Sequence, residues 1–370
     1  GEIMKKIYSL LFVALLLAAC SDNSSSANEE AENTQSTQES EIFIFGSDYT
    51  TGELYINSTE QTFLFNQDSK VIAAGENVYV LERYGADNVI KLNKEKNADK
   101  YEVSWQIALE DASNPSDIVS INKEKLWLSQ EGADNILQLD ANTGKILKQI
   151  NIQKFKDKNG LSAGAVDLEI KNDTLFVLLQ RYAFDSEMFS TYYPNTGLLA
   201  LYDKNSGEFL DTLSLLSKNP TAMKISNDKL YIASLGPYND SYGTDADSLR
   251  GVEIFDAKNS KTHFIISGKE LGGGIYAFAT SATEPIAFAA IYKSFGDAPL
   301  MQIDLENSSN KIIEGVQDAE GGLAFDNVSE TLYIGDRTYG NEKVYTWQND
   351  SLEPLDYQGT LPPYNMAVLN

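Results

Sequence analysis

The 370-residue sequence has almost none of two residue types on which much enzyme chemistry depends, with one cysteine, Cys20, and one histidine, His263. A single thiol excludes an intramolecular disulfide framework. A single histidine argues against a Ser-His-Asp site and against a histidine-ligated metal. Basic residues are also few, at 29 Lys and Arg against 54 Asp and Glu, so the formal net charge is −25. That charge argues against nucleic acid or an anionic lipid surface as a partner.

Long hydrophobic runs are confined to the N-terminus. The cationic segment Met4-Lys5-Lys6 precedes an almost continuous apolar run from Ile7 to Leu17. This run is too short to span a bilayer stably, but it has the length of the hydrophobic region of a signal peptide. The following Leu17-Ala18-Ala19-Cys20 resembles the lipobox of bacterial lipoproteins, in which the cysteine receives a lipid. We therefore expect residues 1–19 to be a signal peptide and Cys20 to carry acyl chains that anchor the protein to a membrane.

The segment after Cys20 is polar throughout. Residues 21–40 contain no aromatic residue and no aliphatic residue larger than alanine. Such a segment buries too little apolar surface to offset the entropy of ordering it, so we expect residues 20–40 to be the lipidated cysteine and a disordered linker. Ser21 follows the cysteine, which resembles the outer-membrane sorting pattern of lipoproteins and implies a cell-envelope protein. Residues 41–370 remain as the folded domain.

Short alternating apolar runs recur from Glu41 onward between Gly, Asn and Asp residues, and long helical periodicity is missing. This pattern predicts a nearly all-β domain. One kind of run returns every 45 to 57 residues or so, which is the length of a propeller blade with variable loops. Its copies are Val78-Tyr79-Val80, Leu126-Trp127-Leu128, Leu175-Phe176-Val177, Leu230-Tyr231-Ile232, Ile286-Ala287-Phe288 and Leu332-Tyr333-Ile334.

Each end of the domain supplies only part of a unit. The C-terminus ends in one strand-like segment, Met366 to Leu369, whereas Ile42 to Tyr49 parallels Leu332 to Tyr339 and so begins at the second strand of a unit. Joining the two ends gives a seventh blade, with three strands from residues 42–64. We therefore predict a seven-bladed β-propeller of four-stranded antiparallel blades, closed by pairing the C-terminal strand with the N-terminal strands. Such closure leaves no open sheet edge.

The repeated Leu-Tyr-Ile run is followed by polar turns, and Asp-x-x-Thr/Ser-Gly turns occur at Asp140 to Gly144 and at Asp203 to Gly207. These features resemble the YVTN-type and quinoprotein-like seven-bladed propellers of secreted bacterial proteins. The resemblance covers residues 42–370. It implies a fold rather than an activity, because the motifs are structural and recur in functionally unrelated proteins.

The loops between the second and third strand of each blade share cationic and aromatic residues. With the first strand innermost, these loops emerge on one face of the ring, which we call the loop face. The pairs could stack on sugar or peptide groups and hydrogen-bond to them. They could equally pack between blades, with the arginines paired to carboxylates. The candidate ligand-binding residues are Tyr49, Arg83, Tyr84, Arg181, Tyr182, Tyr238, Lys293, Phe295, Arg337 and Tyr339.

Two of these loops are long. Residues 181–197 are rich in aromatic side chains, which favours a lid or a partner-docking patch, with packing over the ring as the alternative. Residues 236–250 contain Asp240, Asp245 and Asp247, which are candidate Ca²⁺ ligands even though their spacing matches no EF-hand loop. No other cofactor is predicted.

Three kinds of function stay open. The tether, the ring and the lack of a recognisable nucleophile or base favour a non-catalytic binding or scaffold module for a glycan, peptide or protein partner. An enzyme at the channel mouth is the second, either a carboxylate-based hydrolase or lyase or a Ca²⁺-dependent lactonase, with Asp117, Asp167 and Glu320 as the carboxylates nearest the starts of inner strands. The third is a scaffold subunit of an outer-membrane assembly machine, since lipidated eight-bladed propellers with that role are similar in outline.

Overall fold

The computed structural model describes residues 40–95, 100–156, 162–185, 190–238, 249–256, 259 and 261–370. The predicted signal peptide and the lipidation site Cys20 lie outside this range, and so do the candidate metal ligands Asp240, Asp245 and Asp247. No helix among the described residues has both the length and the apolar character needed to cross a membrane.

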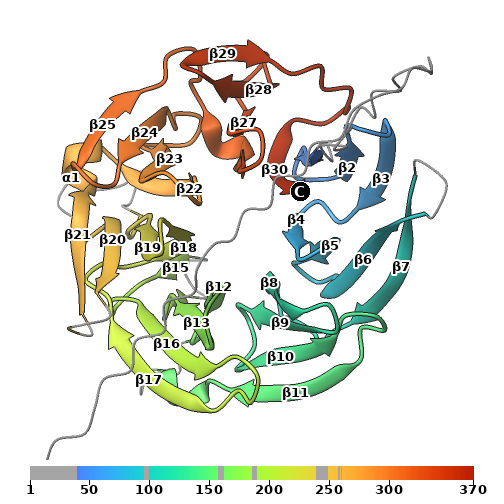
Figure 1. Cartoon of the computed structure of the whole chain (residues 1–370), viewed down its shortest axis with the longest axis vertical. Helices are drawn as coiled ribbons and strands as arrows, with labels where there is room; N and C mark the ends of the chain where they lie inside the picture. The colour runs from blue at the N-terminus through green and yellow to red at the C-terminus, as the bar shows by residue number, and fades with distance from the viewer. Residues whose placement is uncertain are drawn as a thin grey trace, which may run out of the picture. The chain divides into compact units, whose positions relative to one another are not determined.

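The folded unit, residues 39–370, consists of seven four-stranded antiparallel sheets arranged around a central axis (Figure 1). Blade 1 contains β30 (Pro363–Leu369), β1 (Glu41–Ser47), β2 (Gly52–Ile56) and β3 (Gln61–Phe65), from the axis outward. Blade 2 contains β4 (Ser69–Ala74), β5 (Asn77–Glu82), β6 (Asn88–Lys94) and β7 (Tyr101–Ala108). Blade 3 contains β8 (Pro115–Asn122), β9 (Lys125–Gln130), β10 (Asn135–Asp140) and β11 (Ile146–Asn151).

Blade 4 contains β12 (Ala165–Lys171), β13 (Thr174–Leu179), β16 (Leu198–Asp203) and β17 (Phe209–Ser214), with the hairpin β14 (Ala183–Asp185) and β15 (Ser190–Tyr192) inserted. Blade 5 contains β18 (Pro220–Ser226), β19 (Lys229–Ser234), β20 (Gly251–Asp256) and β21 (Lys261–Ser267). Blade 6 contains β22 (Gly274–Thr280), β23 (Ile286–Tyr292), β24 (Leu300–Asp304) and β25 (Ser309–Ile312). Blade 7 contains β26 (Leu323–Asp326), β27 (Thr331–Asp336), β28 (Lys343–Gln348) and β29 (Ser351–Pro354). Short helical turns occur at η1 (Gln153–Phe155), α1 (Gly268–Leu271) and η2 (Ala319–Gly321).

The predicted closure of the ring is confirmed. Strand β1 pairs with β30 in an antiparallel register that runs from Glu41 opposite Leu369 to Gly46 opposite Pro363. Strands β2 and β3 complete the blade, so its inner strand comes from the C-terminus and its other three from the N-terminal part. The fold class and the seven-blade count are therefore as the sequence predicts.

The second strand of each blade is apolar on both faces, unlike an ordinary surface strand, because each blade packs between two neighbours. In β13 the residues from Leu175 to Leu179 are all buried, whereas β11 and β17 at the outside are largely exposed. The apolar clusters cross from blade to blade, as Trp127 of blade 3 packs with Val177 and Tyr202 of blade 4. Burial between blades, rather than alternation along one strand, therefore explains the repeated apolar runs.

The Asp-x-x-Thr/Ser-Gly turns are formed as the sequence indicates. The Oδ1 of Asp140 accepts hydrogen bonds from the backbone amides of Asn142 and Thr143 and from the Thr143 hydroxyl. Gly144 then adopts a φ of 72°, in the left-handed region that favours glycine. Asp203 makes the equivalent turn with Ser206. These turns fix the connection from the third to the outer strand.

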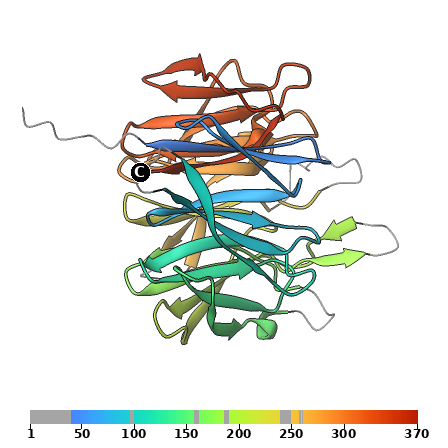
Figure 2. The same cartoon turned by 90° about the vertical axis from the view of Figure 1, so that its right-hand side faces the viewer.

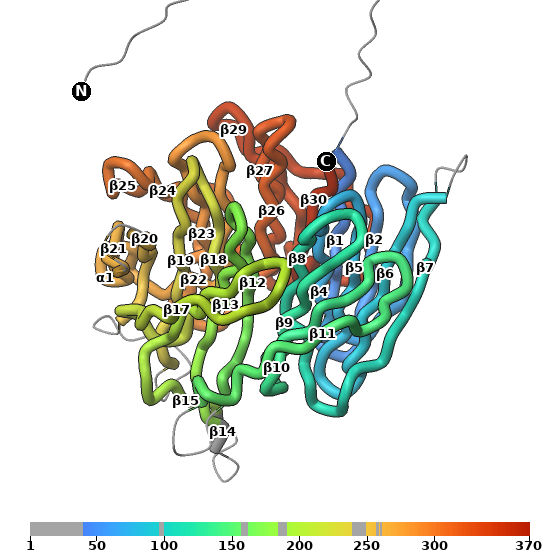
Figure 3. Tube along the Cα trace, turned by 60° about the horizontal axis from the view of Figure 1, so that its bottom comes forward, coloured from blue at the N-terminus to red at the C-terminus, as the bar shows by residue number. Residues whose placement is uncertain are grey.

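The two faces of the ring are distinguishable. Figure 2 shows the strands running across the thickness of the ring, with the β14–β15 hairpin projecting from one side and the C-terminus on the other. The hairpin belongs to the loop face, since it connects the second and third strands of blade 4. Figure 3 shows that it extends beyond the other loops of that face. Glu41 begins a second strand and therefore lies on the opposite face, together with its partner Leu369.

Candidate functional site

The loop-face end of the central channel contains a cavity of about 390 Å³, which we call the channel-mouth cavity. Every blade contributes to its lining, so the whole ring positions it. Its polar and aromatic lining residues are Lys70, Arg83, Ser116, Glu131, Gln180, Tyr193, Asn219, Thr221, Tyr238, Tyr276, Glu320, Tyr364 and Asn365.

One position of the inner strands supplies much of this lining. One residue near the start of six inner strands lines the cavity; it is the second residue of the strand in five blades and the third, Tyr276, in blade 6. In five of the six strands the register with the next strand shifts at that residue. Such a bulge re-aims a side chain, here toward the channel. Blade 7 differs, because Glu320 in η2 lines the cavity just before the strand begins. The six residues are Lys70, Ser116, Val166, Thr221, Tyr276 and Tyr364.

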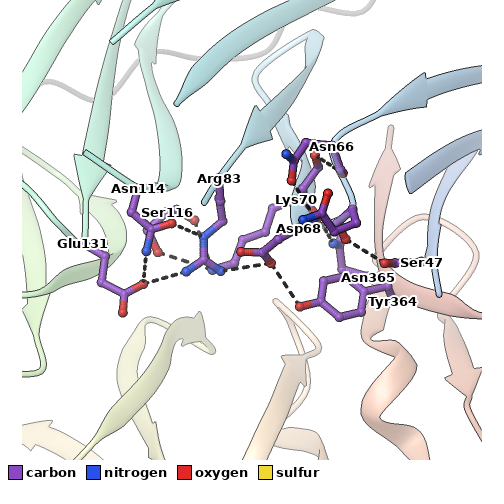
Figure 4. Close-up of polar contacts among 12 residues, drawn as sticks. Ser47, Asn66, Asp68, Lys70, Arg83, Asn114, Ser116, Glu131, Tyr364 and Asn365 are labelled. Carbon is purple, nitrogen blue, oxygen red and sulfur yellow. Dashed lines mark hydrogen bonds and ion pairs between the residues drawn. The ribbon is translucent and has the colours of Figure 1, made fainter. Parts of the chain in front are cut away.

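The basic side of the cavity is formed by Arg83 and Lys70 (Figure 4). The Arg83 guanidinium forms an ion pair with Glu131, with 2.7 Å between Nη2 and Oε2, and its Nε donates to Asn114 at 3.0 Å. It thereby joins blade 2 to blade 3. Lys70 donates only to the backbone oxygen and hydroxyl of Ser116, both at 3.3 Å, and forms no ion pair among the described residues. Burial, together with the Arg83 charge, lowers the pKa of Lys70.

The acidic side of the cavity is formed by Glu320, which is 6% exposed. Its Oε1 atom is buried and has no hydrogen-bond partner among the described residues. Burial, and secondarily the charge of Asp318, raise the pKa of Glu320 to about 7. Gln180 presents a second such acceptor, because its Oε1 is also unpartnered while its Nε2 donates to Asn219 and to the Pro220 carbonyl. The cavity therefore contains two buried acceptors that lack donors.

Tyrosine rings cover the part of the wall near Glu320. The ring of Tyr292 lies 5.8 Å from that of Tyr238 in an edge-on arrangement and 6.0 Å from that of Tyr276 in a stacked one. Burial raises the pKa of Tyr238 and of Tyr276, so both hydroxyls are neutral at physiological pH. Tyr364 lines the cavity from the neighbouring blade 1, and its hydroxyl donates to Asp68 at 3.1 Å.

Asp117 and Asp167 lie beside one another in the channel, but each is used to join blades. An Asp117 oxygen accepts the backbone amide of Leu168 at 2.8 Å, and an Asp167 oxygen accepts that of Met223 at 2.6 Å. Burial and the adjacent Asp167 raise the pKa of Asp117 well above its ordinary value. Lys224 lies 3.6 Å from Asp167 and compensates part of the negative charge.

The candidate ligand-binding residues divide into two groups. Arg83, Arg181, Tyr182 and Arg337 reach back to neighbouring segments. Arg337 donates to the Pro363 carbonyl at 2.7 Å and to the Ser47 carbonyl at 3.1 Å, while its guanidinium lies 4.9 Å from the ring centre of Tyr49. Arg181 donates to the carbonyl of Phe155, and the Tyr182 hydroxyl donates to that of Glu131. Within the described residues these four side chains therefore contact the protein itself.

The second group is exposed around the cavity. Lys293 is exposed, and Tyr84, Phe295 and Tyr339 have exposed fractions of 73%, 76% and 98%. Among the described residues, seven aromatic side chains are at least 40% exposed. Six of them lie between the second and third strands of their blades, and the exception is Phe209 on β17. We call these six, which come from six different blades, the aromatic rim: Tyr49, Tyr84, Tyr192, Tyr238, Phe295 and Tyr339.

The long loop 181–197 contains structure that the sequence pattern does not predict. Ala183 pairs with Tyr192 and Phe184 with Thr191 in the β14–β15 hairpin. Tyr193 follows the hairpin, lines the channel-mouth cavity and lies 6.5 Å from the Tyr182 ring. This loop therefore contributes to the cavity wall as well as to the rim.

Several cavity residues were not among the sequence candidates, notably Lys70, Glu131, Tyr276 and Tyr364. Three of them share a position near the start of an inner strand, since Lys70 and Tyr364 are the second residue of theirs and Tyr276 is the third. In the part of the chain that the structure describes, no group of three or more His, Cys, Asp or Glu side chains is arranged to hold a metal ion.

Comparisons with known proteins bear on the fold. No protein-family model and no curated protein sequence matches the chain. Among solved structures, it is similar to AztD from Citrobacter koseri at 12% identity, with 89% of this chain and 97% of that chain covered and a TM-score of 0.52. The chain is a seven-bladed β-propeller. The structure of apo AztD gives a TM-score of 0.51 at the same identity and coverage, and BamB from Moraxella catarrhalis gives 0.46 at 12% identity, covering 80% and 78% of the two chains. At such identity, the likeness to AztD shows the fold alone.

Proposed function

We propose that this propeller is a lipid-anchored binding module of the bacterial cell envelope, which holds a glycan, peptide or protein partner at its loop face. The observation that carries the proposal is the aromatic rim around the channel-mouth cavity. An exposed set of large rings gathered on one face is typical of binding surfaces, whereas scattered single residues are not.

The rim and the cavity complement one another. Tyr238 belongs to both, since its side chain is exposed and also lines the cavity. A ligand that enters the cavity would therefore contact rings at the rim, which supply large contact area at low entropic cost. The cavity volume of about 390 Å³ lies within the range of small-molecule sites, about 300–1,000 Å³. Such a site fits a small polar ligand or the end of a longer one.

The position of Glu41 supports a tethered arrangement. Glu41 begins β1 on the face opposite the loop face, and the predicted linker immediately precedes it. A linker attached there leaves the rim and the cavity free of the attachment point. This arrangement suits a protein that is anchored through Cys20 and presents its loop face to a partner.

Two of the three candidate carboxylates in the channel have structural roles. Asp117 and Asp167 each accept a backbone amide of the next blade, so both carboxyl groups already have structural partners. A general acid or base must be able to exchange its proton with a substrate. We therefore place no catalytic step on these two residues.

Binding assays with the full chain in detergent test this proposal. We would screen arrays of bacterial envelope glycans and of peptides, and then compare the wild type with the triple variant Tyr84→Ala, Phe295→Ala and Tyr339→Ala. We expect the triple variant to bind any partner found at least tenfold more weakly, because three exposed rings are lost together.

The matched control is the double variant Leu64→Ala and Ile312→Ala. Both residues are exposed and apolar, at 73% and 51%, but they lie on the outer strands β3 and β25. This control should bind like the wild type. If the wild type and the triple variant bind the partner with equal affinity, the loop face is not the binding site. The same conclusion follows if the triple variant and the control lose the same amount of affinity.

A further inference from the structure

Within the part of the chain that the structure describes, two charged residues of the channel-mouth cavity, Lys70 and Glu320, have no ion-pair partner, and they define the kind of ligand the cavity accepts. We propose that the group that enters is zwitterionic, with a primary ammonium group bound by Glu320 and a carboxylate bound by Lys70, as in a free amino acid or a short peptide. This proposal rests on the proposed binding function and names its ligand class.

The acidic end of the cavity suits an ammonium group. Glu320 has one buried carboxylate oxygen without a donor, and an ammonium group supplies three donors. The tyrosines near it present rings to the same space, with Tyr238 and Tyr276 lining the cavity beside Glu320. Aromatic faces attract a cation through their quadrupole, most strongly where water is excluded. A carboxylate with tyrosine rings around it is therefore suited to a cation.

The basic end of the cavity suits a carboxylate. Arg83 is already neutralised by Glu131 at 2.7 Å, so it adds little free positive charge. Lys70 is not neutralised in this way, because its contacts are the backbone oxygen and hydroxyl of Ser116. The charges of Glu131, Asp117 and Asp167 favour the Lys70 ammonium, but none of them forms an ion pair with it among the described residues. A buried ammonium without an ion-pair partner is costly, and an anionic ligand group offsets that cost. Lys70 is therefore the residue that gains most from a bound carboxylate.

The basic and acidic ends of the cavity lie on blades 2 and 7, which are the two neighbours of blade 1. Lys70 is on β4 of blade 2, and Glu320 immediately precedes β26 of blade 7. Between these blades stands blade 1, whose Tyr364 also lines the cavity. The proposal places one ligand across Tyr364, in the cavity that both charged residues line. A neutral sugar would satisfy hydrogen bonds in the cavity but would neutralise neither Lys70 nor Glu320.

Calorimetry and thermal-shift measurements on the full chain test the proposal. The probes are the common amino acids and a set of dipeptides, each dipeptide also in N-acetylated and in C-amidated form, with glucose and glucosamine as sugar probes. We expect free dipeptides or amino acids to bind, and either modification to weaken binding at least tenfold.

Variants assign the two ends. Glu320→Gln should weaken binding of the free dipeptide and abolish its sensitivity to N-acetylation, whereas Lys70→Met should abolish its sensitivity to C-amidation. Glu314→Gln and Lys269→Met alter exposed residues outside the cavity and should bind like the wild type.

The outcomes separate this proposal from the broader one. If blocked dipeptides or neutral sugars bind as tightly as free dipeptides and depend on the aromatic rim, the binding function stands and the zwitterionic ligand is refuted. If no probe or array component binds the folded protein, both proposals fail. Equal affinities of wild type, Glu320→Gln and Lys70→Met for a free dipeptide would also refute the assignment.

Discussion

Asp167 of β12 accepts a hydrogen bond from the backbone amide of Met223 in β18, with 2.6 Å between oxygen and nitrogen. Asp117 makes the same contact with Leu168 at 2.8 Å, and Asn365 makes it with Val71 at 2.8 Å. Each acceptor is the third residue of its inner strand. These bonds connect inner strands that share no sheet, so one side-chain position holds neighbouring blades together.

We expect Asp167→Ala to destabilise the protein by about 1–3 kcal/mol, because it leaves a buried backbone amide of Met223 without its acceptor. Urea unfolding followed by tryptophan fluorescence measures this. Glu208→Ala in the same blade removes an exposed carboxylate and should change stability by no more than about 0.5 kcal/mol. An unfolding midpoint of Asp167→Ala equal to that of Glu208→Ala would show that the contact contributes nothing.

Asn365 makes two bonds at the point where the ring closes. Its Oδ1 accepts the Val71 amide, and its Nδ2 donates to the Ser69 carbonyl at 2.7 Å. Asn365→Asp should therefore destabilise the ring although it preserves shape, because a carboxylate oxygen would face the Ser69 carbonyl. Hydrogen exchange should become faster in β1 and β30. Exchange that remains at the wild-type rate in both strands would contradict this account.

The pKa of Glu320, raised from 4.5 to about 7 by burial, predicts a dependence of stability on pH. The folded protein holds a proton on Glu320 that the unfolded chain releases, so stability falls as pH rises from about 4.5 to 7. Asp318 adds to this effect and Arg337 opposes it. Glu320→Gln should therefore be more stable than the wild type at pH 8, by an amount of order 1 kcal/mol, and similar to it at pH 4.

Thermal unfolding of wild type and Glu320→Gln across this pH range checks that prediction. The difference between the two proteins should grow through the window and then level off. If the unfolding temperatures of the two proteins change with pH in parallel, the pKa of Glu320 is not raised in the folded protein. A bound ammonium ligand should reverse the trend, since it favours the charged carboxylate and so should bind more tightly as pH rises.

Lipid attachment at Cys20 is tested by Cys20→Ser. Without the thiol no diacylglycerol can be attached, and the protein should move from the membrane fraction to the soluble fraction of cells. Incorporation of a labelled fatty acid into the wild type, and its loss in the variant, gives a second readout. Ser21→Ala leaves the thiol in place, so this variant should stay in the membrane fraction and should still incorporate the labelled fatty acid. Membrane association of Cys20→Ser equal to that of the wild type would refute the anchor.

The fold could be predicted from the sequence because burial between blades leaves a strong signal. Runs such as Leu175 to Val177 are apolar without alternation, and they recur at the spacing of a blade. The match between Ile42 to Tyr49 and Leu332 to Tyr339 then fixed the closing blade, which the β1–β30 pairing confirms. The hairpin from Ala183 to Tyr192 was not predicted, because the sequence of this segment shows only a loop rich in aromatic residues.

The candidate site could be predicted less well, for a geometric reason. The rings of Tyr84, Phe295 and Tyr339 were assigned to the loop face, and the structure exposes them there. Arg337 was a candidate ligand-binding residue, yet its long side chain folds back to the carbonyls of Ser47 and Pro363. Lys70 was not predicted as a site residue, because it lies in the inner strand β4 and not in a loop. Nothing in the sequence pattern indicates that the second residue of such a strand lines the channel.

The pairing of β1 with β30 also sets an order of events in folding. Residues 41–47 emerge early during synthesis, but the strand that covers their inner edge spans residues 363–369. Until that segment is available, blade 1 has an unpaired strand and the ring stays open. Contacts between residues so far apart in sequence form slowly. Under the export that we propose, the incomplete ring would have to be protected from aggregation until residues 363–369 have crossed the membrane.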